Sequence, residues 1–156
     1  MKLDILAIGS HPDDVELGCS GTIAKEISKG KKVGILDLTR GELGTRGSAE
    51  IREKEANDAA KILNVAFRDN LEFKDGFFKI DDTHQLKLIK VIRKYRPDLI
   101  LCNAPDDRHI DHPKGAKLVV DSCFLSGLKR LRLLMVVLFR SLGDPIIFII
   151  IYNGKV

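Results

Sequence analysis

The sequence has no tryptophan, only three cysteines and no long uninterrupted apolar run. Cys19, Cys102 and Cys123 are widely spaced and form no CxxC pair, which argues against a disulfide scaffold and against a cysteine-ligated zinc site. We expect them to be small buried residues in a reducing compartment, and therefore predict a cytoplasmic protein. No signal peptide is expected, because Asp4 interrupts the strand-like segment that follows Lys2.

Residues 1–128 carry no net charge, because their basic and acidic residues are equal in number. Five of the 26 basic residues and one of the 22 acidic residues lie in residues 129–156, so this segment carries the whole net charge of +4. No interleaving of basic and aromatic residues accompanies it, and we expect no nucleic-acid partner. Residues 133–152 approach the length of a membrane span, but Arg140, Asp144 and Pro145 interrupt them, so membrane association is not expected.

Apolar runs typical of buried strands alternate with helical patterns over residues 3–123. The strands are predicted at residues 3–9, 32–38 and 98–103. Helices are predicted at residues 20–29 before Gly30, 48–63 with Ser48 as N-cap, 83–95, and 113–123 with Pro113 first. The segment 39–47 is a predicted loop, and 64–81 is mixed, with short strands and a turn at Asp75-Gly76. This alternation predicts an α/β domain whose parallel sheet is covered on both faces.

The core-facing residues of the helix at 83–95 follow from its periodicity. We expect contacts with the core from Leu86, Ile89, Val91, Ile92 and Tyr95.

Two clusters of residues with metal-binding chemistry follow predicted strands. Ser10-His11-Pro12-Asp13-Asp14 follows the first strand, and residues 106–112, Asp-Asp-Arg-His-Ile-Asp-His, follow the strand at 98–103. In an open parallel sheet, ligands bind beyond the carboxyl ends of strands, where the winding direction reverses. If these two strands are neighbours across that point, both clusters face one crevice.

A catalytic zinc ion prefers three nitrogen or oxygen ligands and one open position. His11, Asp14 and His112 would supply two imidazoles and a carboxylate, and Asp13 would remain free as a base. The simpler interpretation is that these residues form turns, or that Asp111 or His112 caps the following helix. The position of both clusters at strand ends favours a metal site, for Zn²⁺ or another divalent metal.

The same residues carry a resemblance to the LmbE-like deacetylases, a family that includes the PIG-L enzymes. Residues 8–21 resemble the opening motif of that family, and residues 106–113 resemble its second metal motif. Residues 36–47 and 50–56 look like its substrate loop and following helix. Together with Leu101-Cys-Asn103, these segments, within about residues 1–130, are most similar to the bacillithiol-biosynthesis deacetylases.

The resemblance implies a Rossmann-like three-layer sandwich and hydrolysis of the N-acetyl group of a glucosamine conjugate. In the bacillithiol branch the substrate would be N-acetylglucosaminyl malate, a small molecule, and the products acetate and a free amine. By position, His11, Asp14 and His112 match the zinc ligands of the family, and Asp13 matches its general base. His109 matches the histidine that stabilises or protonates the tetrahedral intermediate, and Asp111 matches a carboxylate that orients a histidine. His109, if cationic, would stabilise a developing oxyanion.

Arg52 matches a residue that helps to form the substrate pocket of the family. Its guanidinium could bind a malate carboxylate in fork geometry. An ion pair with Glu55, three residues later on the same helix, is an equally favoured alternative.

After Leu128 the chain no longer resembles the family. We therefore expect a deacetylase domain at residues 1–128 and an anomalous basic and apolar tail at 129–156, which an out-of-frame segment would explain. Family members are usually longer, and their C-terminal part supplies strands, pocket walls and oligomer contacts. The homo-oligomer of the family is therefore not expected to carry over, and exposed runs such as residues 146–151 favour aggregation.

Three other interpretations stay open at this stage, of which a membrane-associated protein is the weakest. A nucleotide-binding oxidoreductase is disfavoured, because no GxGxxG motif follows the first strand. A truncated, catalytically inactive zinc- or sugar-binding remnant of the deacetylase family is the main alternative to an active enzyme.

Overall fold

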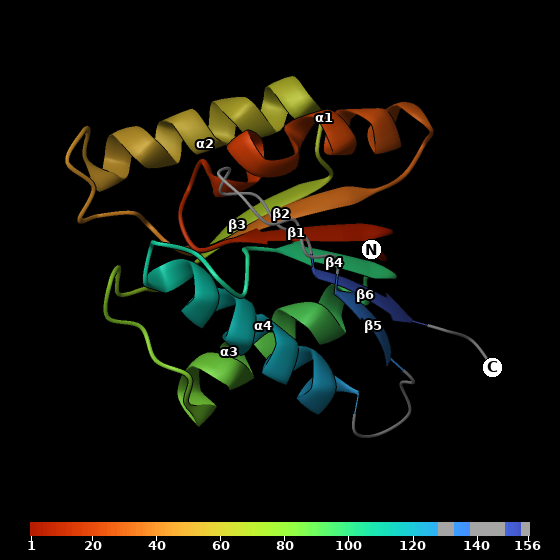
Figure 1. Cartoon of the computed structure of the whole chain (residues 1–156). Helices are drawn as coiled ribbons and strands as arrows, with labels where there is room; N and C mark the ends of the chain where they lie inside the picture. Colours follow the sequence, from red (N-terminus) through yellow and green to blue (C-terminus); the bar gives the residue numbers. More distant parts are fainter. Residues whose placement is uncertain (128–132, 138–148, 154–156) are drawn as a thin grey trace.

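The computed structural model describes residues 1–127, 133–137 and 149–153 (Figure 1). Its elements in chain order are β1 (Ile5–Gly9), α1 (Asp14–Ser28), β2 (Val33–Thr39), α2 (Ala49–Leu63), β3 (Phe67–Phe73), α3 (Asp82–Tyr95), β4 (Leu99–Cys102), α4 (Asp111–Ser126), β5 (Leu133–Val137) and β6 (Ile149–Asn153).

Strands β1 to β4 form a parallel sheet in the order β3-β2-β1-β4. Ile8 in β1 pairs with Leu36 in β2 on one side and with Cys102 in β4 on the other. The chain winds outward from β1 through β2 to β3 and then returns to the opposite side of β1. The predicted neighbours, β1 and β4, therefore lie on either side of the point where the winding reverses, which is where α/β sheets bind ligands.

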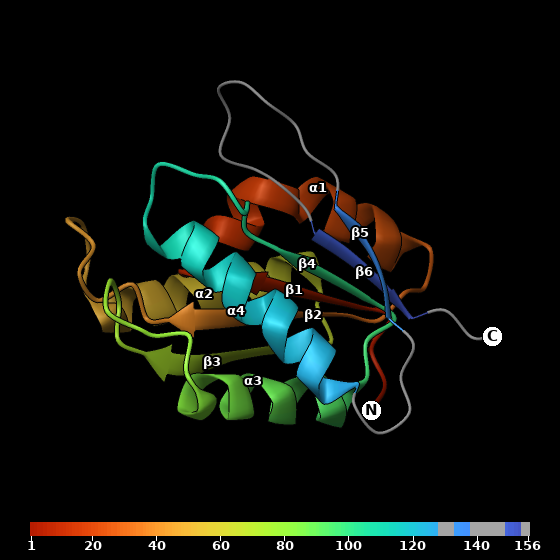
Figure 2. The same ribbon diagram turned by 60° about the horizontal axis from the view of Figure 1, so that its bottom comes forward.

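Helices cover both faces of this sheet. Helices α1 and α2 pack on one face, and α3 and α4 pack on the other (Figures 1 and 2). This arrangement confirms the predicted Rossmann-like three-layer sandwich.

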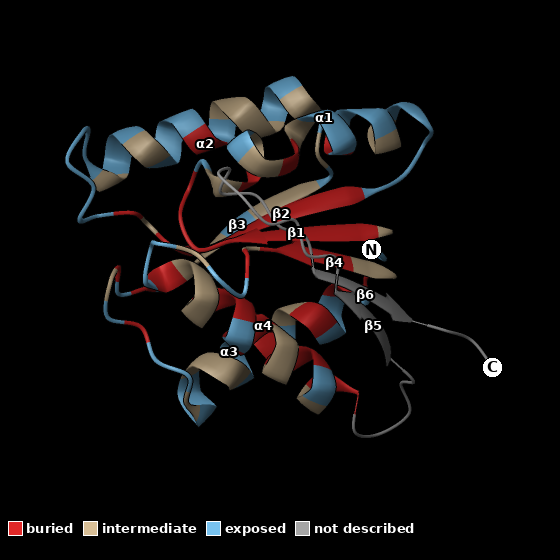
Figure 3. Ribbon diagram, in the orientation of Figure 1, coloured by how far each residue is buried: buried red, intermediate tan, exposed pale blue. Residues whose placement is uncertain are grey.

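Alternation along β1 divides its side chains between two cores. Ile5 and Ala7 belong to the core under α1 and α2, whereas Leu6 and Ile8 belong to the core under α3 and α4. Because both faces are covered, β1 and β2 are buried along their full lengths (Figure 3). Each Å² of buried apolar surface contributes about 25 cal/mol, so burial on both faces is the main contribution to the stability of the sheet. The sheet in turn fixes the positions of the loops at its carboxyl end.

Helix α1 begins at Asp14, six residues before the predicted start at residue 20. Asp14 and Glu16 lie in its first turn, where free backbone N–H groups favour negative charge. Gly18, within the part of the helix that was not predicted, has low helix propensity and weakens the local helical signal there. The earlier start places Asp14 at the rigid end of a helix instead of in a loop.

Other predicted boundaries agree more closely with the structure. The Ser48 side chain accepts a hydrogen bond from the Ile51 N–H and caps α2 as predicted. Helix α4 begins at Asp111, so Pro113 occupies the third helical position and not the first. In α3 the prediction for Leu86 was wrong: its side chain is 56% exposed, and Leu88 is fully buried in its place. The mixed segment 64–81 contains one strand, β3, which pairs with β2.

The predicted tail at residues 129–156 lies largely outside the described residues. Within it, the backbones of β5 and β6 form an antiparallel pair, separate from the parallel sheet. The division at residue 128 and an out-of-frame origin of the tail stay predictions. No helix among the described residues is both long enough and apolar enough to cross a membrane.

Candidate metal centre and active site

All seven residues that the sequence nominated lie together at the carboxyl end of the sheet. Six of them line one pocket of about 450 Å³: His11, Asp13, Asp14, Arg52, His109 and His112. The seventh, Asp111, is fully buried beside it, with Oδ2 3.3 Å from His11 Nε2. The loops after β1 and β4 and the start of α2 bring them together, because β1 and β4 are adjacent strands.

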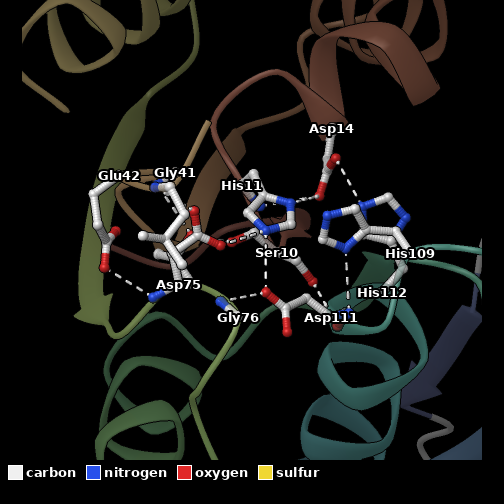
Figure 4. Close-up of polar contacts among 12 residues, drawn as sticks. Ser10, His11, Asp14, Gly41, Glu42, Asp75, Gly76, His109, Asp111 and His112 are labelled. Atoms are coloured by element: carbon white, nitrogen blue, oxygen red, sulfur yellow. Dashed lines mark hydrogen bonds and ion pairs between the residues drawn. The ribbon is translucent and has the colours of Figure 1, made fainter. Parts of the chain in front are cut away.

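The His11 ring lies between two groups of carboxylates (Figure 4). Its Nε2 is 3.0 Å from Asp75 Oδ1 and 3.3 Å from Asp111 Oδ2. Ionised carboxylates only accept hydrogen bonds, so Nε2 carries the proton of the neutral ring. The lone pair is then on Nδ1, which faces Asp14 Oδ2 at 3.7 Å.

The His112 ring has the complementary arrangement. Its Nδ1 is 3.0 Å from Asp107 Oδ2, and its Nε2 is 3.3 Å from Asp14 Oδ1. If Nδ1 donates to Asp107, the lone pair of the neutral ring is on Nε2 and points at Asp14. Two imidazole lone pairs and one carboxylate therefore converge, and only a proton or a cation between them removes the repulsion.

The donor set fits a divalent cation of the zinc type. Two imidazole nitrogens and a carboxylate are ligands that zinc uses in catalytic sites. Metal-bound histidines usually donate their other ring N–H to a carboxylate, and Asp107, Asp111 and Asp75 stand in that position here. Ring nitrogens of His11, His109 and His112 lie within 4.8 Å of one another. A ring nitrogen of His11 and carboxylate oxygens of Asp75 and Asp111 form a second group within the same distance.

The charges of the site shift the pKa values of its members in opposite directions. Burial disfavours the charged ring of His112, but Asp14 and Asp107 outweigh burial and raise its pKa to about 9. Burial also acts on Asp14, but hydrogen bonds from His11 and His112 hold its pKa well below the usual range. In the metal-free protein a proton on His112 thus occupies the place of a cation.

Asp13 differs from its neighbour Asp14. Desolvation by the surrounding pocket raises the pKa of Asp13, although its side chain is 56% exposed, and the charge of Arg52 only partly opposes this effect. A carboxylate with a raised pKa is a better proton acceptor, which suits a general base. The backbone of Asp13 has φ of 102°, a conformation rare for a non-glycine residue, so the surrounding structure must hold this turn in place.

Arg52 supplies part of that support. Its Nη2 donates to the Pro12 carbonyl at 2.6 Å and to Asp13 Oδ2 at 3.2 Å. The partners recorded for Arg52 are thus in the turn after β1, whereas the alternative from the sequence was Glu55. Gly41 has φ of +63°, and a Cβ there would lie 2.6 Å from Arg52 Nε, so the loop passes the guanidinium only because this residue is glycine.

His109 stacks on His112 with 4.8 Å between ring centroids. Its Nδ1 accepts a hydrogen bond from the Asp111 N–H at 3.3 Å. Burial and the neighbouring rings of His11 and His112 lower the pKa of His109. The lowered pKa favours the neutral ring, and the hydrogen bond to Nδ1 then places its proton on Nε2.

Sequence reasoning gave no role to three residues that the structure places at the site. Asp75 is buried; its Oδ2 accepts from the Leu43 N–H at 3.0 Å, and its own N–H donates to Glu42. Asp107 holds His112, and Asn103 Nδ2 donates to Asp14 Oδ2 at 3.0 Å. Asp75-Gly76 had the pattern of an ordinary turn, and no spacing in the sequence links it to His11, 64 residues away.

The comparisons with known proteins agree with this geometry. Residues 6–123 match the family model PIG-L, described as GlcNAc-PI de-N-acetylase. The chain is 32% identical over 134 residues to diacetylchitobiose deacetylase of Thermococcus kodakarensis, covering 80% of this chain and 50% of the relative. It is 30% identical over 128 residues to mycothiol S-conjugate amidase of Streptomyces coelicolor, covering 64% of this chain and 43% of the relative.

Among solved structures, the conserved protein TT1542 of Thermus thermophilus has a TM-score of 0.78 and 44% identity. The match covers 82% of this chain and 58% of that one. The matched part thus spans about half the length of these relatives. None of the three matches decides for the bacillithiol branch. The family model covers most of the chain, including both metal-type loops, and the chain belongs to the PIG-L family of de-N-acetylases.

Proposed function

We propose that this chain is a metal-dependent N-deacetylase that removes the acetyl group from an N-acetylglucosamine conjugate. One observation carries the proposal: His11 and His112 each turn a lone pair toward Asp14 while other carboxylates hold their opposite nitrogens. A divalent ion bound there would polarise the amide carbonyl and lower the pKa of the attacking water. We propose zinc as that ion, because the donor set is two imidazoles and one carboxylate.

The protein's own residues then divide the proton transfers. Asp13 accepts a proton from the attacking water, for which its raised pKa suits it, and returns the proton to the leaving amine. The Nε2–H of neutral His109 donates a hydrogen bond to the developing oxyanion. Asp111 and Asp75 keep His11 in one orientation. Water supplies the oxygen of acetate, and the second product is a free amine.

The finer substrate assignment is N-acetylglucosaminyl malate. Arg52 lines the pocket and brings its guanidinium to the pocket edge. A guanidinium in this position supports a substrate that carries a carboxylate. The substrate partner is therefore a small N-acetylated amino sugar. We also propose a cytoplasmic location, which is supported by the burial of all three cysteines.

The test is acetate release by the purified chain from N-acetylglucosaminyl malate and from N-acetylglucosamine. We expect turnover that a chelator abolishes and that added zinc restores, with the malate conjugate preferred. Asp13→Asn should lower kcat by about 10²- to 10⁴-fold while metal content is unchanged. Asp69→Asn, the same substitution at an exposed position outside this pocket, is the control and should leave both unchanged.

The results separate the two candidates. Metal binding without turnover would favour the inactive zinc- or sugar-binding remnant. Turnover that survives in the Asp13→Asn variant would remove Asp13 as the base.

A further inference from the structure

Asn103 is placed at the switch point of the sheet, directly after β4. Its Oδ1 accepts hydrogen bonds from the Ser10 N–H at 2.8 Å and from Ser10 Oγ at 3.0 Å. Its Nδ2 donates to Asp14 Oδ2 at 3.0 Å. One amide therefore joins the end of β1, the end of β4 and the first residue of α1.

The bond to Asp14 determines which oxygen of that carboxylate is available. Asp14 Oδ2 accepts from two donors, Asn103 Nδ2 and the His11 N–H, each at 3.0 Å. Asp14 Oδ1 faces His112 Nε2 at 3.3 Å. With Oδ2 held by two donors, rotation of the carboxylate is restricted and Oδ1 stays directed toward His112 Nε2.

The other end of the Asn103 amide rests on a rigid support. Ser10 is fully buried, and its carbonyl accepts from both the N–H and the Oγ1 of Thr39, at 3.0 and 2.9 Å. Ser10 Oγ is also 3.0 Å from the Asp111 carbonyl. A Cβ at Gly115 would lie 2.5 Å from Ser10 Oγ, so α4 reaches this support only because position 115 is glycine. The amide is thus fixed by the sheet and by α4 together.

The chemistry of the amide fixes its orientation. In the opposite orientation, the amide oxygen would face the Asp14 carboxylate, so that two acceptors would meet. The NH₂ group would face the Ser10 N–H, so that two donors would meet. An aspartate at this position could accept from Ser10 but, when ionised, could not donate to Asp14. Asparagine is the side chain of this length that does both.

We propose that Asn103 is a positioning residue that aligns the Asp14 carboxylate for metal binding. The inference rests on the proposed metal site and assigns Asn103 no contact with substrate. Partners that orient a metal ligand typically contribute 10- to 100-fold in metal affinity. The same range is expected here.

The experiment compares Asn103→Ala and Asn103→Ser with a matched control, Asn70→Ala. Asn70 lies within β3, where its side chain donates to the Thr39 carbonyl at 2.6 Å and accepts from the Glu72 N–H. No hydrogen bond between the described residues joins Asn70 to Asp14. Zinc affinity is measured by competition with a chromogenic chelator. The visible spectrum of the Co²⁺-loaded protein reports ligand geometry, and the melting temperature of the metal-free protein reports the fold.

We expect both Asn103 variants to bind zinc about 10- to 100-fold more weakly and to have an altered Co²⁺ spectrum. Asn70→Ala should have the affinity and spectrum of the unaltered chain. If Asn103→Ala does not fold, Asn103→Ser is the variant that tests the inference. Its small polar side chain leaves room for a water molecule to accept hydrogen bonds from Ser10.

Unchanged affinity and spectrum in the folded Asn103 variants would overturn the inference and leave the proposed metal site intact. An equal loss in Asn70→Ala would also overturn it, because the effect would then be a general loosening of the sheet end. Absence of zinc binding by the unaltered chain would overturn both the inference and the metal site.

Discussion

The parallel sheet contains two clusters of buried charge, and comparing them separates a structural cluster from a functional one. On the face under α1 and α2, Arg68 Nε and Nη2 donate to the two oxygens of Asp37 at 2.9 and 3.1 Å. Arg68 Nη1 donates to Glu16 and to the Ala56 carbonyl. At the carboxyl end of β1 and β4, the ion pairs of Asp14 among the described residues are with the imidazoles of His11 and His112. Its other hydrogen bonds come from neutral groups, Asn103 Nδ2 and the His11 N–H.

The difference lies in where the neutralising cation comes from. Arg68 brings a permanent charge, and its fork of donors binds both oxygens of the Asp37 carboxylate. Around Asp14 the imidazoles are cationic only when protonated, and a metal ion replaces that proton. Lys114 and Arg52 supply fixed cations to Asp111 and Asp13, at the edge of the second cluster. The carboxylate between the two imidazoles, Asp14, has ion pairs with histidines alone among the described residues, and this absence of a fixed partner indicates a metal site.

Removal of the internal cation from the first cluster should have the largest effect on stability. Arg68→Met leaves the buried Asp37 and the half-buried Glu16 without this partner, and we expect the free energy of unfolding to fall by about 3–5 kcal/mol. Urea denaturation measures this change. Lys54→Met, which breaks an exposed pair with Asp58, is the control and should change the free energy of unfolding far less. Equal losses in the two variants would contradict the structural role of Arg68.

Removal of the shared carboxylate from the second cluster should abolish the metal site and spare the first cluster. Asp14→Ala removes a direct ligand, so zinc affinity should fall by more than the 100-fold or so expected for an orienting partner. Chelator competition on the folded variant measures the fall. Retention of the affinity of the unaltered chain would show that Asp14 is not a ligand.

The metal-free protein should lose stability as the pH rises. The pKa of His112 is raised to about 9 from the ordinary value of 6.5, so its protonated form stabilises the fold below pH 6.5. This contribution is lost as the pH rises from 6.5 to about 9. Melting temperatures in a chelator buffer across that range test the sign, and His112→Gln should flatten the slope. A melting temperature that rises with pH and depends on His112 would contradict the interpretation that a proton on His112 takes the place of a cation in the metal-free site.

The smallest effect is expected at Arg52, which supports Asp13 from the edge of the second cluster. Arg52→Lys keeps the charge but loses the geometry that reaches both Pro12 and Asp13, so kcat should fall about tenfold, equivalent to about one hydrogen bond. The metal content should be unchanged. Arg40→Lys is the matched control, because Arg40 pairs with the exposed Glu50 and Glu53. A similar fall in kcat for Arg40→Lys would contradict a specific role of Arg52.

The local part of the fold was predictable because it depends on neighbours in the chain. The apolar runs of β1 and β2 and the Ser48 cap of α2 all have short-range signals. The start of α1 and the burial of Leu88 were not predictable in this way. At these positions tertiary packing and the turn at Asp13 outweighed local propensity.

The sequence by itself determined the alternating elements, the two loops of metal-ligand type and their family resemblance, because each is written in contiguous residues. Only the tertiary structure decided that β1 lies beside β4, that Asp75 and Asp111 share one nitrogen of His11, and that Asn103 holds Asp14. These contacts join residues 64 to 100 positions apart. Their geometry comes from strand register and from burial on both faces of the sheet, which no local pattern encodes.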